Sequence, residues 1–465
     1  MHDDNIIVFQ QTFINRKNEL EILEERFTGS KPEFLVMYGR RRVGKTELVT
    51  HFLNRRQGIY FLAEEKRYMD NLNDMKEVMS DFLMDDEFKI MGFKNWVQLF
   101  KSFSERLKER TIIVIDEFPY LVRENKGIPS EFQKIWDMYL HKNNRIMLII
   151  VGSSIGMMEE LLARKSPLFG RRTAQLEIKP VDLFQAREFL PDYAMTDCIK
   201  AYGCLDGIPL YLKQFDHKLT IYENMENAFF RRDALLYSEA EILLKQEFRE
   251  PANYFAILKA ISFGKTKQNE IVNYTDIDKS IISKYIKNLE EIRIIRKEYP
   301  VDEKKEMRKN ARYTFSDNYF RFWFRFIYPR RTLIERSSPD AIKTLKNDYN
   351  RYLGYIFEQT AKDFLWNRRP FDFGHVGRWW HKDIEIDLVA LNEELKEIFF
   401  FECKWKSLGE VDARKIIFKL KGKSGFVKWN KYKRNEFFGL FAKHVENKCG
   451  LRKEGLFVFD LDDFK

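Results

Sequence analysis

The chain has 465 residues, of which 44% are hydrophobic and 33% charged, which is the composition of a soluble protein with about two to four domains. Its 81 basic residues exceed its 71 acidic ones to give a net charge of +10, which is compatible with binding to nucleic acid but does not establish it. The sequence has no apolar stretch of membrane-spanning length, and its N-terminus is acidic where a signal peptide would be basic, so we expect a cytoplasmic protein. Its four cysteines form no C-x-x-C pair, so neither a zinc site nor a disulfide framework is indicated.

A phosphate-binding loop is predicted near the N-terminus. The apolar run 34–38 predicts a buried strand, and the segment 39–46, GRRRVGKT, then fits G-x-x-x-x-G-K-[ST] at every fixed position. The two glycines allow the backbone N–H groups to point at phosphate oxygens. Lys45 can reach the β and γ phosphates of a nucleotide, and the Thr46 hydroxyl can ligate Mg²⁺. The alternative is a strand-to-helix turn with a chance lysine.

Two acidic residues end the buried strand that is predicted at 111–118. We expect Asp116 to hold Mg²⁺ and Glu117 to polarise the attacking water, although an acid that caps the following helix is the alternative. Two more strands, 58–63 and 145–154, complete the pattern of a parallel, doubly wound α/β sheet, and the second ends in Ser153, whose hydroxyl can sense the γ-phosphate.

The segment 166–173, SPLFGRRT, places Arg171 and Arg172 beside a glycine. These arginines can act as phosphate-stabilising fingers or can simply form surface salt bridges, and the spacing does not decide between the two. The residues predicted to bind the nucleotide are Gly39, Arg40, Arg41, Arg42, Val43, Gly44, Lys45, Thr46, Glu47, Asp116 and Ser153.

Six motifs in this order resemble a family of P-loop ATPases that is common in archaea and some bacteria and is related to the AAA+ and STAND ATPases. They are FINRKNEL, GRRRVGKT, IIVIDEF, VGSS, SPLFGRRT and DGIPLYL, and they cover about the first half of the chain. The resemblance implies that Lys45, Thr46, Asp116, Glu117 and Ser153 form a nucleotide site. It also implies that Arg171 or Arg172 is the finger and that Pro209 marks a helical lid.

Three helices and a hairpin predict a winged helix-turn-helix over residues 251–330. The helices are expected at 254–263, at 266–274 with Thr266 as N-cap, and at 278–290, where Ile281, Ile282, Tyr285, Ile286 and Leu289 would form the apolar stripe. The hairpin would pair 294–299 with 311–315 around a charged loop, 302–310. Exposed Lys279, Lys284 and Lys287 would contact DNA phosphates, or else would face a protein partner.

The last section resembles the PD-(D/E)XK nuclease superfamily, in which an Asp on one strand lies beside Glu-x-Lys on the next. A predicted helix, 352–366, carries Glu358, and predicted strands 384–390 and 397–405 carry Asp387 and the pair Glu402 and Lys404. Because side chains alternate along a strand, Glu402 and Lys404 share one face. Asp387 and Glu402 would bind Mg²⁺, whereas the alternative is a buried lysine–carboxylate cluster that only supports the sheet.

We therefore predict a P-loop ATPase domain with a helical lid at 1–250, a winged helix at 251–330 and a nuclease-like α/β domain at 331–465. The expected function is an ATP- and Mg²⁺-dependent protein that regulates or powers cleavage of DNA. The alternative is an ATP-driven switch whose C-terminal domain is inactive. A homo-oligomer remains open, and no acceptor site favours a small-molecule kinase.

Overall fold

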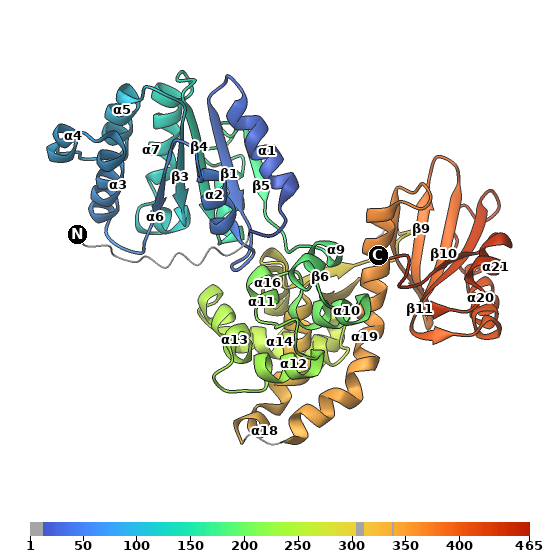
Figure 1. The fold of residues 1–465 in the computed structure, drawn as a ribbon. Helices are drawn as coiled ribbons and strands as arrows, with labels where there is room; N and C mark the ends of the chain where they lie inside the picture. Colours follow the sequence, from blue (N-terminus) through green and yellow to red (C-terminus); the bar gives the residue numbers. More distant parts are fainter. Residues whose placement is uncertain (1–12, 304–310, 337–338) are drawn as a thin grey trace. The chain divides into compact units, whose positions relative to one another are not determined.

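The protein, seen as a computed structural model, divides into two compact units, Met1–Pro180 and Val181–Lys465 (Figure 1). The structure describes residues 13–303, 311–336 and 339–465, so most of the predicted loop 302–310 lies outside the described residues. Among the described residues, every helix is too short or too polar to cross a membrane. The predicted division into three domains stays a prediction.

The first unit is built on a five-stranded sheet in which every pair of neighbours is parallel. The strand order is β2-β3-β4-β1-β5. The strands are β1 Glu33–Tyr38, β2 Gly58–Leu62, β3 Thr111–Asp116, β4 Ile146–Gly152 and β5 Ala174–Glu177. This arrangement confirms the predicted parallel α/β sheet, and it adds β5, which the sequence pattern did not predict. All residues of β1, β3 and β4 are buried, which explains their unbroken apolar runs.

Helices cover both faces of this sheet, and Figure 1 shows α1 and α3 on opposite sides of it. The larger core joins alternate residues of β1, β3 and β4 to apolar side chains of α3, α5 and α7, among them Trp96, Phe100 and Phe132. The helical elements of this unit are α1 Lys17–Thr28, α2 Lys45–Leu53, α3 Tyr68–Leu83, α4 Asp86–Ile90, α5 Trp96–Arg106, α6 Phe118–Glu124, α7 Ile128–Ile135, the π-helical turn η1 Trp136–Leu140 and α8 Ile155–Leu162.

The second unit begins with helices. They are α9 Leu183–Ala186, η2 Arg187–Phe189, α10 Met195–Leu205, α11 Pro209–Leu212, α12 Ile221–Phe229 and α13 Leu235–Glu247. The DGIPLYL segment connects α10 to α11, and its glycine is required by a close backbone contact. A Cβ at Gly207 would lie 1.7 Å from the carbonyl oxygen of Val181, so no other residue fits without moving the backbone.

Three helices and an antiparallel hairpin follow, at the positions that the sequence predicts. They are α14 Pro251–Ser262, α15 Gln268–Thr275, α16 Lys279–Glu291, β6 Ile295–Glu298 and β7 Arg312–Phe315. Two details differ from the prediction. Thr266 is not the N-cap of α15, since the Glu270 carboxylate accepts from the N–H groups of Thr266 and Lys267 instead. Ile281 is 46% exposed, so the buried stripe of α16 is narrower than predicted.

An aromatic segment then packs into the core of the second unit. Its elements are α17 Asn318–Phe322, the π-helical turn η4 Trp323–Ile327, η5 Tyr328–Arg330 and α18 Arg331–Glu335. The Tyr319 hydroxyl donates to the carbonyl of Leu236 at 3.1 Å, and the Trp323 Nε1–H donates to that of Tyr237 at 2.7 Å. Both rings are fully buried, which rules out a base-stacking surface here.

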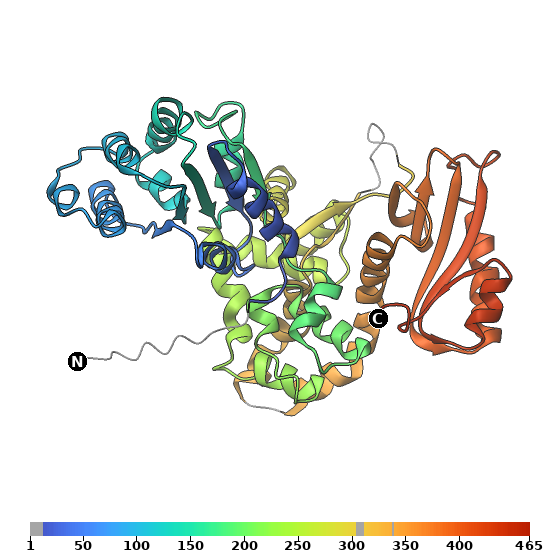
Figure 2. The ribbon, with the colours of Figure 1, turned by 45° about the horizontal axis from the view of Figure 1, so that its top comes forward.

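The C-terminal part is a mixed five-stranded sheet of order β12-β11-β10-β9-β8. Strands β8, β9 and β10 are antiparallel neighbours, whereas β10, β11 and β12 run parallel. Helices α19 and α20 cover its opposite faces (Figures 1 and 2). The elements are α19 Pro339–Arg368, β8 His375–His381, β9 Ile384–Asn392, β10 Glu397–Leu408, α20 Glu410–Ser424, β11 Asn435–Val445, α21 Lys448–Lys453 and β12 Phe457–Phe459.

Candidate functional site

The loop between β1 and α2 has the backbone that a phosphate-binding loop needs. Gly44, which caps α2, has a φ of 89°, in the left-handed region that glycine adopts without strain. A Cβ at Gly39 would lie 2.2 Å from the carbonyl oxygen of Ile178, so the loop can pass β5 only with glycine there. Arg42 has a φ of 70°, which is rare for a side chain of its size. The N-terminus of α2 therefore opens into this loop.

Lys45 and Thr46 start α2 and lie beside the end of β3. The Lys45 ammonium, 6% exposed, donates to the carbonyls of Gly39 and Arg40 at 2.8 and 2.9 Å, which places it inside the loop. The Thr46 hydroxyl donates to Asp116 Oδ2 at 2.6 Å. Tyr60, from β2, donates to the same oxygen at 2.9 Å, and burial together with the Asp116 charge raises the pKa of its hydroxyl.

Glu117 is held in a strained position opposite Ser153. It does not belong to β3, which ends at Asp116, and its backbone has a φ of 51° where α6 begins. Left-handed backbone in a glutamate costs about 1–3 kcal/mol and is typical of functional positions. The Ser153 hydroxyl lies 2.7 and 2.8 Å from the two carboxylate oxygens of Glu117, and its N–H donates to one of them. The carboxylate is therefore fixed at the ends of β3 and β4.

The remaining residues of the predicted loop have different surroundings. Val43 is fully buried, so only its backbone faces the loop interior. The side chains of Arg40 and Arg41 are partly buried, as is that of Glu47, whereas Arg42 is exposed. Sequence patterns missed Arg16, whose guanidinium donates to the carbonyl of Val43 at 2.7 Å and ties the FINRKNEL segment to the loop.

The two candidate finger arginines make other contacts within the first unit. Arg171 forms an ion pair with Asp137 at 3.1 Å and donates to the carbonyl of Phe169. Arg172 donates to the carbonyl of Leu162 at 3.3 Å. Of the two alternatives for Arg171, the conformation seen here is the surface salt bridge.

A second group of predicted residues comes together within β9 and β10. Lys404 Nζ lies 3.1 Å from Asp387 Oδ2 and 2.6 Å from Glu402 Oε2. The N–H of Cys403 also donates to Asp387 Oδ2, at 2.8 Å. Lys423, from α20, was not predicted, and its ammonium lies 2.6 Å from Glu402 Oε1. Burial lowers the pKa of Lys404, but Asp387 and Glu402 outweigh this, so that its pKa is raised overall.

Glu358 approaches this group from α19. Its Oε2 is 3.4 Å from Arg378 Nε, and neither atom makes a hydrogen bond with another described residue. Arg378 also forms an ion pair with Glu385, two residues before Asp387. Burial raises the pKa of Glu358 to about 8, with a further contribution from the charge of Asp387, and the Arg378 charge opposes both. At neutral pH the Glu358 carboxyl is therefore mostly protonated.

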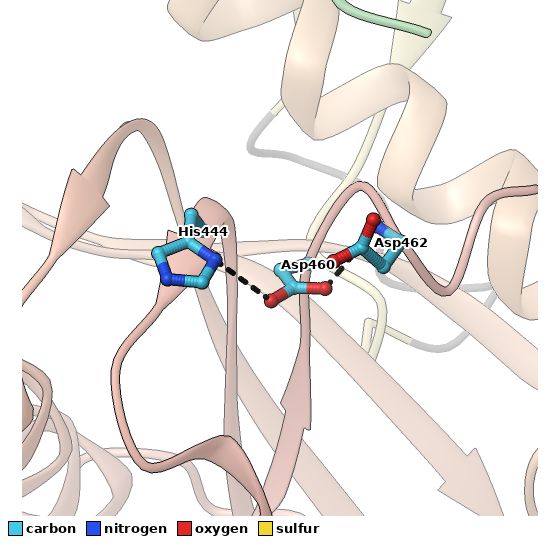
Figure 3. A group of neighbouring side chains, drawn as sticks. All are labelled: His444, Asp460 and Asp462. Carbon is cyan, nitrogen blue, oxygen red and sulfur yellow. Dashed lines mark hydrogen bonds and ion pairs between the residues drawn. The ribbon is translucent and has the colours of Figure 1, made fainter.

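One further group, His444, Asp460 and Asp462, has metal-ligand chemistry that sequence patterns did not predict (Figure 3). His444 Nδ1 lies 3.7 Å from Asp460 Oδ2, and the N–H of Asp462 donates to Asp460 Oδ1. The Lys448 ammonium, however, lies 2.5 Å from Asp460 Oδ1 and 3.1 Å from Asp463. Because a lysine already neutralises the buried Asp460, this group is an ion-pair network beside β12.

Two family models match the chain. One, an ATPase domain predominantly from Archaea, covers residues 13–215, and the other, archaeal and bacterial proteins of unknown function, covers residues 323–416. The Walker-type ATPase of Pyrococcus abyssi has a similar structure, with a TM-score of 0.51, 22% identity and coverage of 68% of this chain and 97% of that chain. This likeness supports a P-loop ATPase fold.

Proteins of Methanocaldococcus jannaschii are similar in sequence. An uncharacterized ATP-binding protein is 49% identical over 45 residues, which are 10% of this chain and 76% of that protein. An uncharacterized protein is 40% identical over 458 residues, which are 97% of this chain and all of that protein. The chain therefore belongs to the same family as this relative, and its N-terminal part is a P-loop ATPase domain of a kind found predominantly in Archaea.

Proposed function

We propose that the first unit binds ATP and hydrolyses it with Mg²⁺. The observation that carries the proposal is the convergence of Lys45, Thr46, Asp116, Glu117 and Ser153, from three separate segments, at the carboxyl ends of β1, β3 and β4. Ligands of open parallel sheets bind at this edge. The similar ATP-binding protein of Methanocaldococcus jannaschii supports the choice of nucleotide.

The residues present suit Mg²⁺. Thr46 and Asp116 offer a hydroxyl and a carboxylate oxygen, which lie 2.6 Å apart, and oxygen is the ligand that Mg²⁺ prefers. The ion would offset charge on the β and γ phosphates. Lys45 and the loop N–H groups would bind those phosphates. Glu117 would orient the attacking water and accept its proton, while Ser153 holds the carboxylate in place.

Two substitutions test this assignment with separate readouts. Lys45→Ala should abolish tight binding of a fluorescent ATP analogue, because it removes the ammonium from the loop. Glu117→Gln should bind the analogue normally but release phosphate at least about 100-fold more slowly, since the water loses its base. Lys126→Ala, at an exposed position of the same unit, is the control. Wild-type turnover in both site variants would contradict the proposal.

We propose as a second function that the C-terminal sheet holds a Mg²⁺-dependent site that cleaves DNA, and that the ATPase regulates or powers it. The supporting observation is that Asp387, Glu402 and Lys404, predicted from two strands, lie within one hydrogen-bonded group. Among the described residues, the contacts of Asp387 engage only Oδ2, so Oδ1 is open to an ion. Mg²⁺ at Asp387 and Glu402 would polarise a scissile phosphate and acidify a water.

Within this site, Lys404 would stabilise the negative charge that develops on the phosphate. The protonated Glu358 is suited to donate a hydrogen bond rather than to ligate the ion. The rival, an ATP-driven switch with an inactive C-terminal domain, is favoured by a different observation. Both oxygens of Glu402 already accept from lysines, as in a cluster that only stabilises the sheet.

Cleavage assays on purified full-length protein separate these functions. Wild-type protein should nick supercoiled plasmid DNA with Mg²⁺ or Mn²⁺, and Asp387→Asn should abolish nicking while the melting temperature and ATP hydrolysis are retained. Asp383→Asn, the same change in the exposed β8–β9 turn, is the control. If wild-type protein cuts neither DNA nor RNA, with or without ATP, and Asp387→Asn lowers the melting temperature, the cluster is structural and the switch is the remaining function.

A further inference from the structure

Two neighbouring hollows lie along the β6–β7 hairpin in the second unit. One, of about 360 Å³, is lined by residues of β6, α19 and β8, including Glu358 and Arg378 of the carboxylate–lysine site. The other, of about 580 Å³, is lined by the start of α15, by β7 and by the end of β8. Lys297 and Trp380 line both hollows. The two hollows are therefore adjacent, with Lys297 and Trp380 between them, and together they are called the groove here.

The outer hollow, of about 580 Å³, has a basic lining. Lys267, Lys297, Arg312 and Lys382 line it together with His381, and none of its lining residues carries a carboxylate. No described carboxylate lies within ion-pair distance of Lys267, Lys297 or Lys382. Their charges are therefore available to an anion, and clustered lysines and arginines in a groove are the pattern of a phosphate-binding surface.

The inner hollow, of about 360 Å³, is also lined by cationic side chains. Arg296 and Arg378 are paired with glutamates there, but no described carboxylate lies within ion-pair distance of Lys362. Burial lowers the pKa of Lys362, with a smaller contribution in the same direction from the charge of Arg296, whereas the charges of Glu298 and Asp363 oppose both. A bound phosphate would give the Lys362 ammonium a direct ion-pair partner.

The aromatic side chains of the groove are covered by cations and do not offer open faces. Arg312 lies 4.6 Å from the centre of the Trp380 ring, and Lys297 lies 5.6 Å from that of Tyr313. Trp380 and Tyr313 are only 7% and 5% exposed. Stacking of bases on these rings is therefore blocked, so the groove suits a sugar–phosphate backbone rather than bases.

Ion pairs connect the groove to the carboxylate–lysine site. Arg312 lies 3.3 Å from one oxygen of Glu385, and Arg378 is paired with its other oxygen. Glu385 is two residues before Asp387 on β9, so both side chains lie on the same side of that strand. A backbone that enters at Lys267 and Lys382 would pass Lys297 and then meet Arg378, whose partner Glu385 is two residues before Asp387.

We propose that this groove binds the phosphodiester backbone of a nucleic acid and leads it to the site at Asp387 and Glu402. The hairpin and the C-terminal sheet then bind one segment together, and the groove, rather than the lysines of α16, supplies most of the phosphate contacts. The proposal rests on the proposed cleavage function for the fate of the bound strand, but binding can be measured without cleavage.

The test compares three triple variants of the full-length protein, each losing three lysine charges. The groove variant is Lys267→Gln/Lys297→Gln/Lys382→Gln, the α16 variant is Lys279→Gln/Lys284→Gln/Lys287→Gln, and the control is Lys218→Gln/Lys343→Gln/Lys453→Gln, whose residues are exposed and line neither hollow. Fluorescein-labelled duplexes of DNA and of RNA are the probes. Fluorescence anisotropy in EDTA, over a range of salt concentrations, measures affinity without cleavage.

The groove variant should bind at least about tenfold more weakly and should reduce the salt slope by about 2 to 3, because each lost phosphate contact removes about 0.9 from it. The control and α16 variants should bind like wild type, and the more strongly affected probe identifies the nucleic acid. The proposal would be overturned if the groove variant bound as tightly as wild type, if the α16 variant lost more affinity, or if wild type did not bind. A groove-dependent affinity in a protein that cuts nothing would support the groove while refuting the cleavage function.

Discussion

The Glu358 carboxyl should make the protein less stable as the pH rises. Its pKa is raised from the ordinary value of 4.5 to about 8, by burial first and then by the charge of Asp387, so the folded protein keeps this proton over a range in which the unfolded chain has lost it. The free energy of unfolding then falls by about 1.4 kcal/mol for each pH unit in this range. The contribution is fully present below pH 4.5 and is lost as the pH rises through 8. Its total is on the order of 5 kcal/mol.

Replacing Glu358 by Gln removes this dependence, because the amide has nearly the shape of the protonated acid and does not titrate. The two proteins should melt at similar temperatures near pH 5. About 4 kcal/mol of the contribution is lost above pH 5. Near pH 9 the variant should therefore melt higher, by roughly 8 °C if 1 kcal/mol corresponds to about 2 °C in a unit of this size. Calorimetric scans of the full-length protein in EDTA at a series of pH values measure the difference.

A matched control is Glu394→Gln, the same change at an exposed position between β9 and β10. It should follow the wild-type curve at every pH. Melting curves of wild type and Glu358→Gln that stay parallel from pH 5 to 9 would show that the Glu358 pKa is not raised, and would refute the account of its surroundings.

Three further outcomes follow from single contacts. Arg16→Ala should weaken binding of the fluorescent ATP analogue, because it removes the hydrogen-bond donor that holds the Val43 carbonyl. The same loss should lower the free energy of unfolding of the first unit by about 1–3 kcal/mol in urea. The control Lys17→Ala should change neither quantity. Gly207→Ala should yield little folded protein on gel filtration, since its Cβ would overlap the Val181 carbonyl, while Gly422→Ala, in open space on α20, should purify normally. Ser153→Ala should slow phosphate release but leave analogue affinity unchanged, because it frees the Glu117 carboxylate, and unchanged turnover would contradict that role.

Much of the first unit could be predicted because its strands are buried on both faces. Such strands are unbroken apolar runs, and the polar residues at or after their carboxyl ends, Lys45, Asp116 and Ser153, mark one edge of the sheet. Strand β5 escaped prediction because Ala174–Glu177 is short and only one of its residues is buried. The contact between Arg16 and the loop depends on how two segments 27 residues apart pack together, which no local spacing reveals.

In the C-terminal site, too, local sequence patterns predict contacts within a strand but not contacts between packed elements. The alternation of side chains along β10 was enough to predict that Glu402 and Lys404 share a face. The second lysine on Glu402, Lys423, comes from α20, and its arrival depends on how that helix packs on the sheet. Arg378 and its two carboxylate partners likewise come from three elements, so their pairing is a property of the tertiary structure.

Helix α19 connects the helices that follow Val181 to the C-terminal sheet. Its 30 residues correspond to about 45 Å along the helix axis. Near its middle, Tyr349 and Tyr352 donate to carbonyls of Lys200 and Gly203 in α10, and further along Phe364 packs on Phe441 and Phe459 of the sheet. The same helix therefore contacts α10 with one part and the C-terminal sheet with another, and Glu358 lies between these two parts. A change in the packing of α10 would thereby change the position of Glu358 relative to the C-terminal sheet.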